Sequence, residues 1–397
     1  MRLLHTGWIV LVLVGFLTPG TARAERRDDT GWFNLQTLLG GAMPDGQNIT
    51  VLHVEAPLSP GVYLPFIGAG TGEFLGKTDF DLTGGGAVSS HASFVGQRWY
   101  GNTQGYAPGI TTIQSYEAGD FLVTVLRVLD AVPSAEWSAF IAGMDPGPAR
   151  SVNNSWILSN ADLVAQRTLR RTDFQTDFYG LIFVNGMNNG AATTAPPGLS
   201  SSFNGMTVGL TNGNSSAGPT LVEGARMKPD LVAPDTATSW AAGQVSGAAV
   251  MLLDQAIAMG SVAGQKPQVV KAIMQAGAEK IVGWEKGDPG TADDVVHPLD
   301  WRFGAGEIQV DRNYDILAAG ESLPNTGMPQ GSLGWANDTL GLNETDDYIV
   351  DFSTANNDLA VALVWHRHHT GNFSTDAVWP LNNLALELWE TDALATT

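Results

Sequence analysis

Residues 227–259, MKPDLVAPDTATSWAAGQVSGAAVMLLDQAIAM, decide the fold of this chain. They contain a short apolar strand at Leu231–Val232, a loop after Pro234 and a predicted helix over Ser239–Met259. The helix is apolar on nearly all of its faces and is rich in Ala, Gly and Ser. Such a helix belongs in the middle of a domain, where small residues allow close packing.

Outward from this stretch, residues 48–320 alternate between strand-like and helix-like segments. Short apolar strands bounded by Gly, Asn and Pro, with amphipathic helices between them, predict an α/β domain around a mostly parallel sheet. The further predicted strands are Ile49–Val54, Gly180–Val184 and Met206–Leu210, and the further predicted helices are Phe121–Leu129, Ser134–Ile141, Ala161–Arg170 and Pro267–Ala276.

The first 24 residues have the pattern of a secretory signal. Arg2 supplies the positive charge, Trp8–Leu17 is a short apolar core, and Ala22-Arg23-Ala24 offers a small-x-small cleavage site. The apolar run is too short to span a bilayer, although an uncleaved N-terminal anchor remains the alternative. We therefore expect export, with residues 1–24 as the signal peptide and 25–322 as the main domain.

A second, smaller unit is predicted at the C-terminal end. Pro324–Gly334 has the composition of a linker. Beyond it, Asp347–Phe352, Leu359–Trp365 and Leu384–Trp389 have the pattern of strands with no helix between them. We interpret residues 335–397 as an incomplete β-sandwich module.

Composition limits the classes of partner. The chain has 397 residues, 40 acidic against 20 basic side chains and no cysteine. The negative charge argues against a nucleic-acid partner, and without disulfides an exported protein must rely on a large core. Carboxylates are available for calcium as a structural ion, but no particular calcium site is recognised and no cofactor is required.

Ser239 is the first candidate for chemistry. A serine in the first turn of a buried helix lies at the positive end of the helix dipole, where free backbone N–H groups can hold an oxyanion. The alternative is that Ser239 only caps its helix, a common use of serine.

Two further positions could complete a catalytic set. His91 begins a predicted helix behind Gly84-Gly85-Gly86, and histidine is the usual base for a serine hydroxyl. Glu55 ends the apolar strand that starts at Ile49, where open α/β sheets place their sites, so its carboxylate could orient the histidine. His53 alternates onto the same face as Glu55, and we interpret it as a packed side chain.

A fourth position follows another strand. Residues 181–190, LIFVNGMNNG, run from a strand into an Asn/Gly turn. The side-chain amide of Asn188 could donate to a developing oxyanion, although Asn-Gly is also ordinary turn chemistry. Acid, histidine, asparagine and serine thus follow one another along one α/β domain, each at the end of a predicted element.

These motifs resemble those of the subtilase family, the subtilisin-like serine peptidases. KPDLVAP (228–234) followed by TSWAAGQVSGAA (238–249) is similar to the family's K-P-D-[IV]-V-A-P and G-T-S-M-A-A-P-H-V-S-G-A-A. The resemblance covers about residues 45–320 and places Ser239 on the nucleophile, His91 on the base and Asn188 on the oxyanion asparagine. Residues 359–365 and 381–388 are similar to a β-sandwich appended to some secreted members.

The chain departs from the family pattern at several positions. The acid is Glu55 where the family has aspartate, Ala237 replaces a glycine, and Gly243-Gln244 stand in for Pro-His. The loop between Pro234 and Ser239 is also shorter than in the family. These changes bear on catalytic efficiency more than on the fold.

The resemblance implies a secreted serine endopeptidase with a three-layer subtilisin-like domain and Glu55, His91 and Ser239 as its triad. It also implies that a polypeptide substrate lies along two segments, which are Glu117, Ala118 and Gly119, and Ser155, Trp156 and Ile157. We expect a monomer with no stable membrane association.

Two alternatives to a peptidase remain. The chain could be a catalytically weak or inactive binding module on a subtilase scaffold. An esterase is disfavoured because no G-x-S-x-G elbow is present. The histidines of 366–369 invite a metal interpretation, but we favour an exposed loop because no further ligands stand at metal-site spacing.

Overall fold

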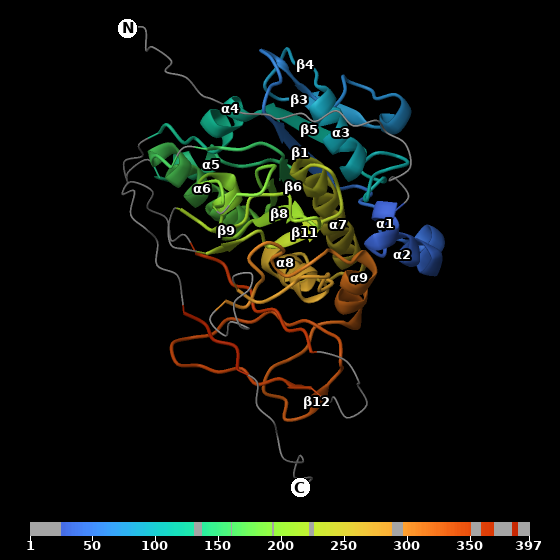
Figure 1. The fold of residues 1–397 in the computed structure, drawn as a ribbon, viewed down its shortest axis with the longest axis vertical. Coiled ribbons are helices and arrows are strands. Elements are labelled where there is room, and N and C mark those ends of the chain that lie inside the picture. The colour runs from blue at the N-terminus through green and yellow to red at the C-terminus, as the bar shows by residue number, and fades with distance from the viewer. Residues whose placement is uncertain are drawn as a thin grey trace.

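The computed structural model describes residues 25–130, 137–159, 161–192, 194–221, 226–287, 297–350, 359–368 and 383–387. The predicted signal peptide, residues 1–24, lies outside these ranges. At the centre of the described chain is a seven-stranded sheet in which every neighbouring pair of strands is parallel (Figure 1). In order across the sheet, the strands are β11 (Leu231–Ala233), β8 (Met206–Leu210), β7 (Ile182–Gly186), β6 (Ala149–Asn154), β1 (Thr50–Glu55), β5 (Thr112–Glu117) and β3 (Thr78–Asp81).

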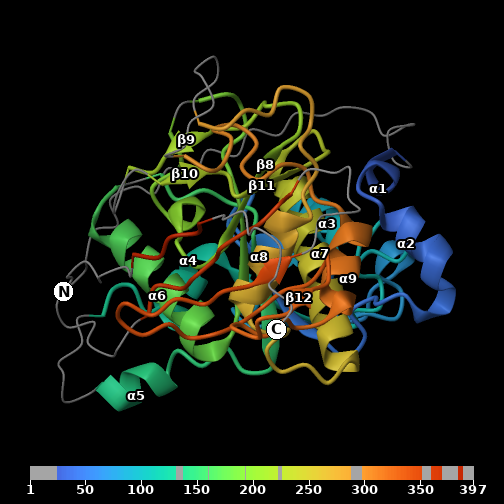
Figure 2. The same cartoon turned by 90° about the horizontal axis from the view of Figure 1, so that it is seen from below.

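Helices cover both faces of this sheet, so the domain has three layers (Figures 1 and 2). One face carries α3 (Ser90–Trp99), α7 (Thr238–Ala258), α8 (Pro267–Ala276) and α9 (Val310–Ala319). The other carries α4 (Ala118–Asp120), the π-helical turn η3 (Phe121–Val125) and α6 (Leu163–Tyr179). The predicted α/β class with a parallel sheet is thereby confirmed.

Alternation along the strands creates two separate cores. In β1, Val51 belongs to the core under α7, whereas Leu52 and Val54 belong to the core under η3 and α6. The same division separates Val184 from Phe183 in β7. Since successive side chains of a strand point to opposite faces, His53 and Glu55 share the face of Val51 and point toward α3 and α7.

Small residues let α3 and α7 pack at close range. A Cβ added to Gly243 would lie 2.8 Å from the carbonyl oxygen of Val95, and one added to Gly247 would lie 3.1 Å from that of Trp99. At the same seam, the ring centroids of Phe94 and Trp240 are 5.6 Å apart. The Gly- and Ala-rich composition of α7 is therefore what allows α3 to approach.

Substitution of Gly247 by alanine is expected to destabilise the domain by about 2 kcal/mol, because the new methyl group overlaps fixed atoms. Its Cβ would lie 2.5 Å from that of Tyr106. Urea unfolding followed by circular dichroism measures the change, with Gly41→Ala as control because a Cβ at Gly41 meets no atom within 4 Å. Equal unfolding midpoints for the two variants would contradict this account of the seam.

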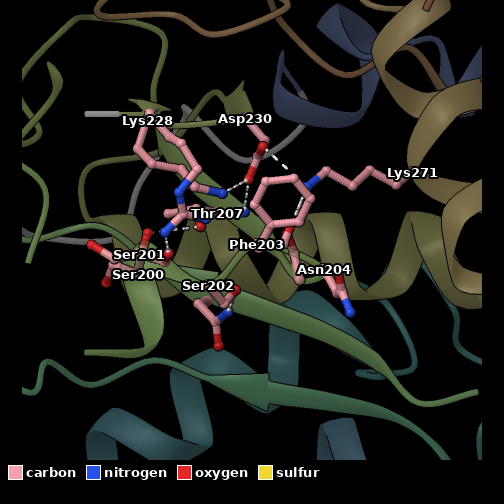
Figure 3. A network of polar contacts seen from close by, with 12 residues as sticks. Ser200, Ser201, Ser202, Phe203, Asn204, Thr207, Lys228, Asp230 and Lys271 are labelled. Atoms are coloured by element: carbon pink, nitrogen blue, oxygen red, sulfur yellow. Dashed lines mark hydrogen bonds and ion pairs between the residues drawn. The ribbon is translucent and has the colours of Figure 1, made fainter. Parts of the chain in front are cut away.

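A buried ion cluster lies at the amino-terminal ends of strands β8 and β11 (Figure 3). The Asp230 carboxylate lies 2.6 Å from Lys228 Nζ and 3.2 Å from Lys271 Nζ, and it accepts the backbone N–H of Thr207 at 2.8 Å. Lys271 belongs to α8, so the cluster joins this helix to two strands. The charged residues of the stretch 227–234 therefore support the fold at the amino-terminal ends of the strands, opposite the carboxyl ends.

Several predicted elements are found within a few residues of their expected bounds. These include β1, β7, β8, β11, α7 and α8. The predicted helix 161–170 extends to Tyr179 as α6, and helical backbone near the predicted 121–129 ends at Val125. Of the predicted helix 134–141, the described part is α5 (Trp137–Ala142). Strands β3, β5 and β6 and the helices α1 (Glu25–Asp29), α2 (Trp32–Leu39) and α9 were not predicted as elements.

The C-terminal segment does not confirm a β-sandwich. Ile349–Val350 (β13) pairs only with Pro329–Gln330 (β12) among the described residues. Residues 359–368 contain no regular strand, so the prediction of a strand over Leu359–Trp365 is wrong. Most of the predicted strand 384–389 is described, without regular structure, and its last two residues lie outside the described ranges.

Candidate active site

The site lies where the chain changes direction across the sheet. From β1, the chain first builds β3 and β5 on one side and then β6, β7, β8 and β11 on the other. In open α/β sheets, ligands bind outside the carboxyl ends of the strands at such a switch point. Glu55 is the last residue of β1, so the fold places its carboxylate at this position.

Glu55 and His91 form a hydrogen-bonded pair. His91 Nδ1 lies 2.9 Å from Glu55 Oε1, and the two side chains are 10% and 2% exposed. Helix α3 presents the ring from its first turn, where the Ser89 hydroxyl caps the helix by accepting the N–H of Ala92 at 3.2 Å. The predicted pairing of these two residues is present.

The surroundings favour the charged forms of both groups. Burial alone would raise the pKa of Glu55, but the charge of His91 and contacts with His91 and His53 outweigh it and lower that pKa. Burial alone would lower the pKa of His91, but the attraction of Glu55 outweighs it and raises that pKa above its ordinary value. A carboxylate that stabilises an imidazolium is the arrangement a general base requires.

The contacts between α3 and α7 show which positions of the two helices correspond. The close contacts Val95–Gly243 and Trp99–Gly247 join residues whose numbers differ by 148 in both cases. One helical turn before the first contact, the same difference in number makes His91 and Ser239 corresponding positions in the first turns of the two helices. Since Nδ1 of His91 is held by Glu55, Nε2 is the ring nitrogen left for the serine.

Ser239 is the second residue of α7, so its backbone N–H is among the first amides that have no acceptor within the helix. Its hydroxyl donates to the carbonyl oxygen of Ser155 at 3.2 Å, and Ser155 Oγ donates to the Ser239 carbonyl at 2.9 Å. Among the described contacts, the Ser239 hydroxyl is hydrogen-bonded to Ser155 and not to His91. Of the predicted triad, the hydrogen bond between Glu55 and His91 is therefore present. A hydrogen bond between His91 and Ser239 is not among the described contacts.

The Asn/Gly turn after β7 lies against the start of α7. Asn189 Oδ1 accepts the N–H of Thr238 at 2.9 Å and its hydroxyl at 3.1 Å, and so caps the helix that carries Ser239. Asn188 is exposed, and its backbone N–H donates to Ser216 Oγ at 3.1 Å. The turn thus places Asn188, the predicted oxyanion donor, one residue from a direct contact with the helix that carries Ser239.

The two predicted substrate segments differ in backbone conformation. Glu117 ends β5 directly beside Glu55, whereas Ala118 and Gly119 form a helical turn whose Asp120 N–H is accepted by Glu117 Oε2 at 3.1 Å. Ser155 follows β6 and contacts Ser239, as described above. Trp156 is buried in the core beneath α6, and Ile157 is partly exposed.

Two residues at the site acquire functions that the sequence did not predict. Asn189 caps the helix that carries Ser239, although the sequence identified only Asn188 in this turn. His53, predicted as a packed residue, is fully buried but also faces Glu55, with Nε2 3.6 Å from Oε2. The alternation of His53 and Glu55 in β1 was the available signal for this contact.

The expectation of an exposed loop near the C-terminus is wrong for His366, which is buried, and is confirmed for His368, whose side chain is 65% exposed. His366 and Arg367 are buried, and His368 Nδ1 lies 2.8 Å from Asp177 Oδ1 of α6. The backbone of Arg367 is held by Asn204, which accepts its N–H at 2.8 Å. His369 lies outside the described ranges. No group of three or more His, Asp or Glu suited to a metal occurs in the described part of the chain.

No helix in the described ranges has the length and apolar composition needed to cross a membrane.

Comparison with known proteins gives structural matches only. No family model and no curated protein sequence matches the chain. Among solved structures, it is similar to the prenylagaramide maturation protease PagA (18% identity, 71% of this chain and 98% of that one, TM-score 0.45). It is also similar to a lanthipeptide protease (17%, 73% and 95%, TM-score 0.43) and to a cold-adapted subtilisin-like serine proteinase (14%, 65% and 88%, TM-score 0.40).

Proposed function

We propose that this chain is a secreted serine endopeptidase that hydrolyses peptide bonds through Ser239, His91 and Glu55. The observation that carries the proposal is the buried 2.9 Å Glu55–His91 hydrogen bond, and it is supported by the corresponding positions of His91 and Ser239 in the first turns of two packed helices. A serine beside an oriented, charge-stabilised imidazole can be activated as a nucleophile.

In the proposed reaction, the Ser239 hydroxyl turns from the Ser155 carbonyl to His91 Nε2, which is a change between staggered rotamers of one side chain. Ser239 Oγ attacks the peptide carbonyl carbon while His91 accepts the hydroxyl proton. Glu55 holds the Nδ1–H tautomer and stabilises the imidazolium. His91 then protonates the departing amine, and water repeats the sequence on the acyl-enzyme.

The oxyanion would be held at the start of α7. The backbone N–H of Ser239 and the side-chain amide of Asn188 are the proposed donors, and loss of one such donor typically lowers kcat by ~10²–10³. A polypeptide substrate would lie along Glu117–Gly119 and Ser155–Ile157, with Glu117 as the extended part of the first segment. We propose that the enzyme acts as a monomer without a cofactor, with calcium as an optional structural ion.

The test uses the whole chain with denatured casein as a polypeptide substrate and a short-chain p-nitrophenyl ester as the comparison. A fluorophosphonate probe followed by peptide mass spectrometry locates the reactive residue. We expect casein hydrolysis and a single adduct on the peptide that contains Ser239. Ester hydrolysis without casein hydrolysis would favour an esterase, and absence of both turnover and adduct would end the proposal.

A second candidate is a binding module on the same scaffold without turnover. The observation that favours it is the Ser239–Ser155 hydrogen bond, which occupies the hydroxyl in this structure. In that case the probe would leave Ser239 unmodified, while the chain would still bind denatured casein.

The pH profile of kcat/KM is expected to have an acid limb. The midpoint of this limb should lie above pH ~6.5, the ordinary pKa of histidine. Catalysis requires neutral His91, and Glu55 raises the pKa of His91. Activity should therefore increase as pH rises through this raised pKa. Initial rates between pH 5 and 9 measure the limb, and a midpoint below pH ~6 would contradict the described Glu55–His91 pair.

A further inference from the structure

The most informative group that the proposed mechanism does not use is His53. Its side chain is fully buried in β1, two residues before Glu55 on the same face of the strand. Nδ1 of His53 lies 2.8 Å from the hydroxyl of Tyr100, at the end of the helix that carries His91. Beneath α3 there is thus a row of four polar side chains, Tyr100, His53, Glu55 and His91, with hydrogen bonds at its two ends and a 3.6 Å separation between His53 and Glu55.

The contact with Tyr100 on one side and the Glu55 carboxylate on the other together select the tautomer of His53. Tyr100 is buried, and burial raises the pKa of its hydroxyl well above the ordinary value, so the hydroxyl keeps its proton. If this proton is donated to Nδ1, then Nε2 carries the hydrogen and directs it toward Glu55. The opposite tautomer would direct a lone pair at a carboxylate, which is repulsive.

Two buried polar atoms face each other between His53 and Glu55. His53 Nε2 and Glu55 Oε2 are 3.6 Å apart, and neither has another hydrogen-bond partner among the described residues. A buried donor and a buried acceptor are unfavourable without partners, so a small movement that brings them into hydrogen-bond distance is favourable.

From this arrangement we infer that His53 is a positioning residue, which donates from Nε2 to Glu55 and fixes the carboxylate so that its other oxygen meets His91. This inference rests on the proposed function, because the carboxylate it positions is the proposed acid of the triad. Tyr100 in turn fixes the orientation and tautomer of His53.

The same arrangement explains a glutamate at this position. Oε1 is engaged by His91 at 2.9 Å while Oε2 faces His53 at 3.6 Å, so one carboxylate lies between two imidazoles. A side chain one methylene shorter would withdraw the carboxylate by about one C–C bond, ~1.5 Å. It could then no longer span the space between α3 and its own strand.

Polar groups from the neighbouring strands and from the end of α3 surround His53. Ser115 of β5 and Asn153 of β6 lie directly beside it in the sheet and are neutral. Ser115 donates to Asp79 of β3 at 2.7 Å, and burial raises the pKa of Asp79 to about 7. The charge nearest to the imidazole is therefore that of Glu55, with Asp79 beyond Ser115.

The experiment compares His53→Leu, which removes the donor, with His53→Gln, whose side-chain amide can place an N–H near the position of Nε2. Tyr100→Phe is the third variant, because it removes only a hydroxyl and is the safest for folding. For each protein, the titration of His91 is followed by NMR of the Cε1–H group, with the resonance assigned from His91→Gln. Casein hydrolysis gives kcat and KM on the same samples.

Without the His53 donor, the whole charge of Glu55 acts on His91, so the pKa of His91 should rise in His53→Leu and return toward the wild-type value in His53→Gln. The value of kcat should fall about 10-fold in His53→Leu with little change in KM, as expected for one hydrogen bond to a charged group. Tyr100→Phe should change both quantities in the same direction by less.

An unchanged His91 titration in both His53→Leu and Tyr100→Phe would overturn the inference, whether or not the wild type is active. A changed titration in a chain that does not hydrolyse casein would support the inference and contradict the proposed function. The two conclusions are therefore decided by different measurements.

Discussion

Ser239→Ala is expected to lower kcat for peptide hydrolysis by a factor on the order of 10⁶, with little change in KM. The variant lacks the attacking oxygen, and the remaining groups can only bind substrate and stabilise the oxyanion. A residual rate above that of water is expected from those groups alone. The rate of fluorescent-casein hydrolysis at saturating substrate measures the loss.

The matched control is Ser90→Ala, an exposed serine in the first turn of α3 next to His91. This variant should keep wild-type kcat and show no change in its thermal melt. Equal turnover by wild type and Ser239→Ala would remove Ser239 from the mechanism, and loss in both variants would point to damage of the α3–α7 seam.

Glu55→Gln is expected to lower kcat about 10⁴-fold, because a neutral amide can no longer stabilise the imidazolium or enforce the Nδ1–H tautomer. Two histidine N–H groups converge on this side chain, and the amide has one acceptor oxygen where the carboxylate has two. The acid limb of kcat/KM should also move to lower pH, since the charge that raises the pKa of His91 is removed.

Glu55→Asp separates charge from reach in the same position. The charge is kept, but the shorter side chain cannot span both imidazoles, so kcat should fall between wild type and Glu55→Gln. Glu321→Gln removes a carboxylate from an exposed position outside the sheet and should leave kcat unchanged. Faster turnover by Glu55→Asp than by wild type would show that the glutamate hinders catalysis.

The fold was predictable where apolar residues are continuous. Strand β8 and helices α7 and α8 were found from apolar patterns alone, since their burial does not depend on particular partners. Strand β6, ARSVNN, was missed as an element because most of its residues are polar. Its asparagines are buried only because Asn153 donates to Ser246 at 2.9 Å and Asn154 to Asn185 at 3.0 Å, which no local pattern reveals.

In the candidate site, the Glu55–His91 contact was predictable and the supporting contacts were not. Glu55 and His91 could be paired from their places at the ends of elements. The second partner of Glu55 could not, because the orientation of His53 depends on Tyr100, which lies 47 residues away. The hydrogen bond from Ser239 to Ser155 likewise joins residues 84 positions apart and depends on how β6 ends against α7.

The central claim is that Ser239, His91 and Glu55 form one catalytic triad. A crystal structure of the chain after reaction with a small fluorophosphonate tests it most directly. The account predicts phosphorus bonded to Ser239 Oγ, His91 Nε2 within about 3.2 Å of that oxygen, and Nδ1 still on Glu55. An adduct on another residue, or an imidazole that faces away from the modified serine, would contradict it.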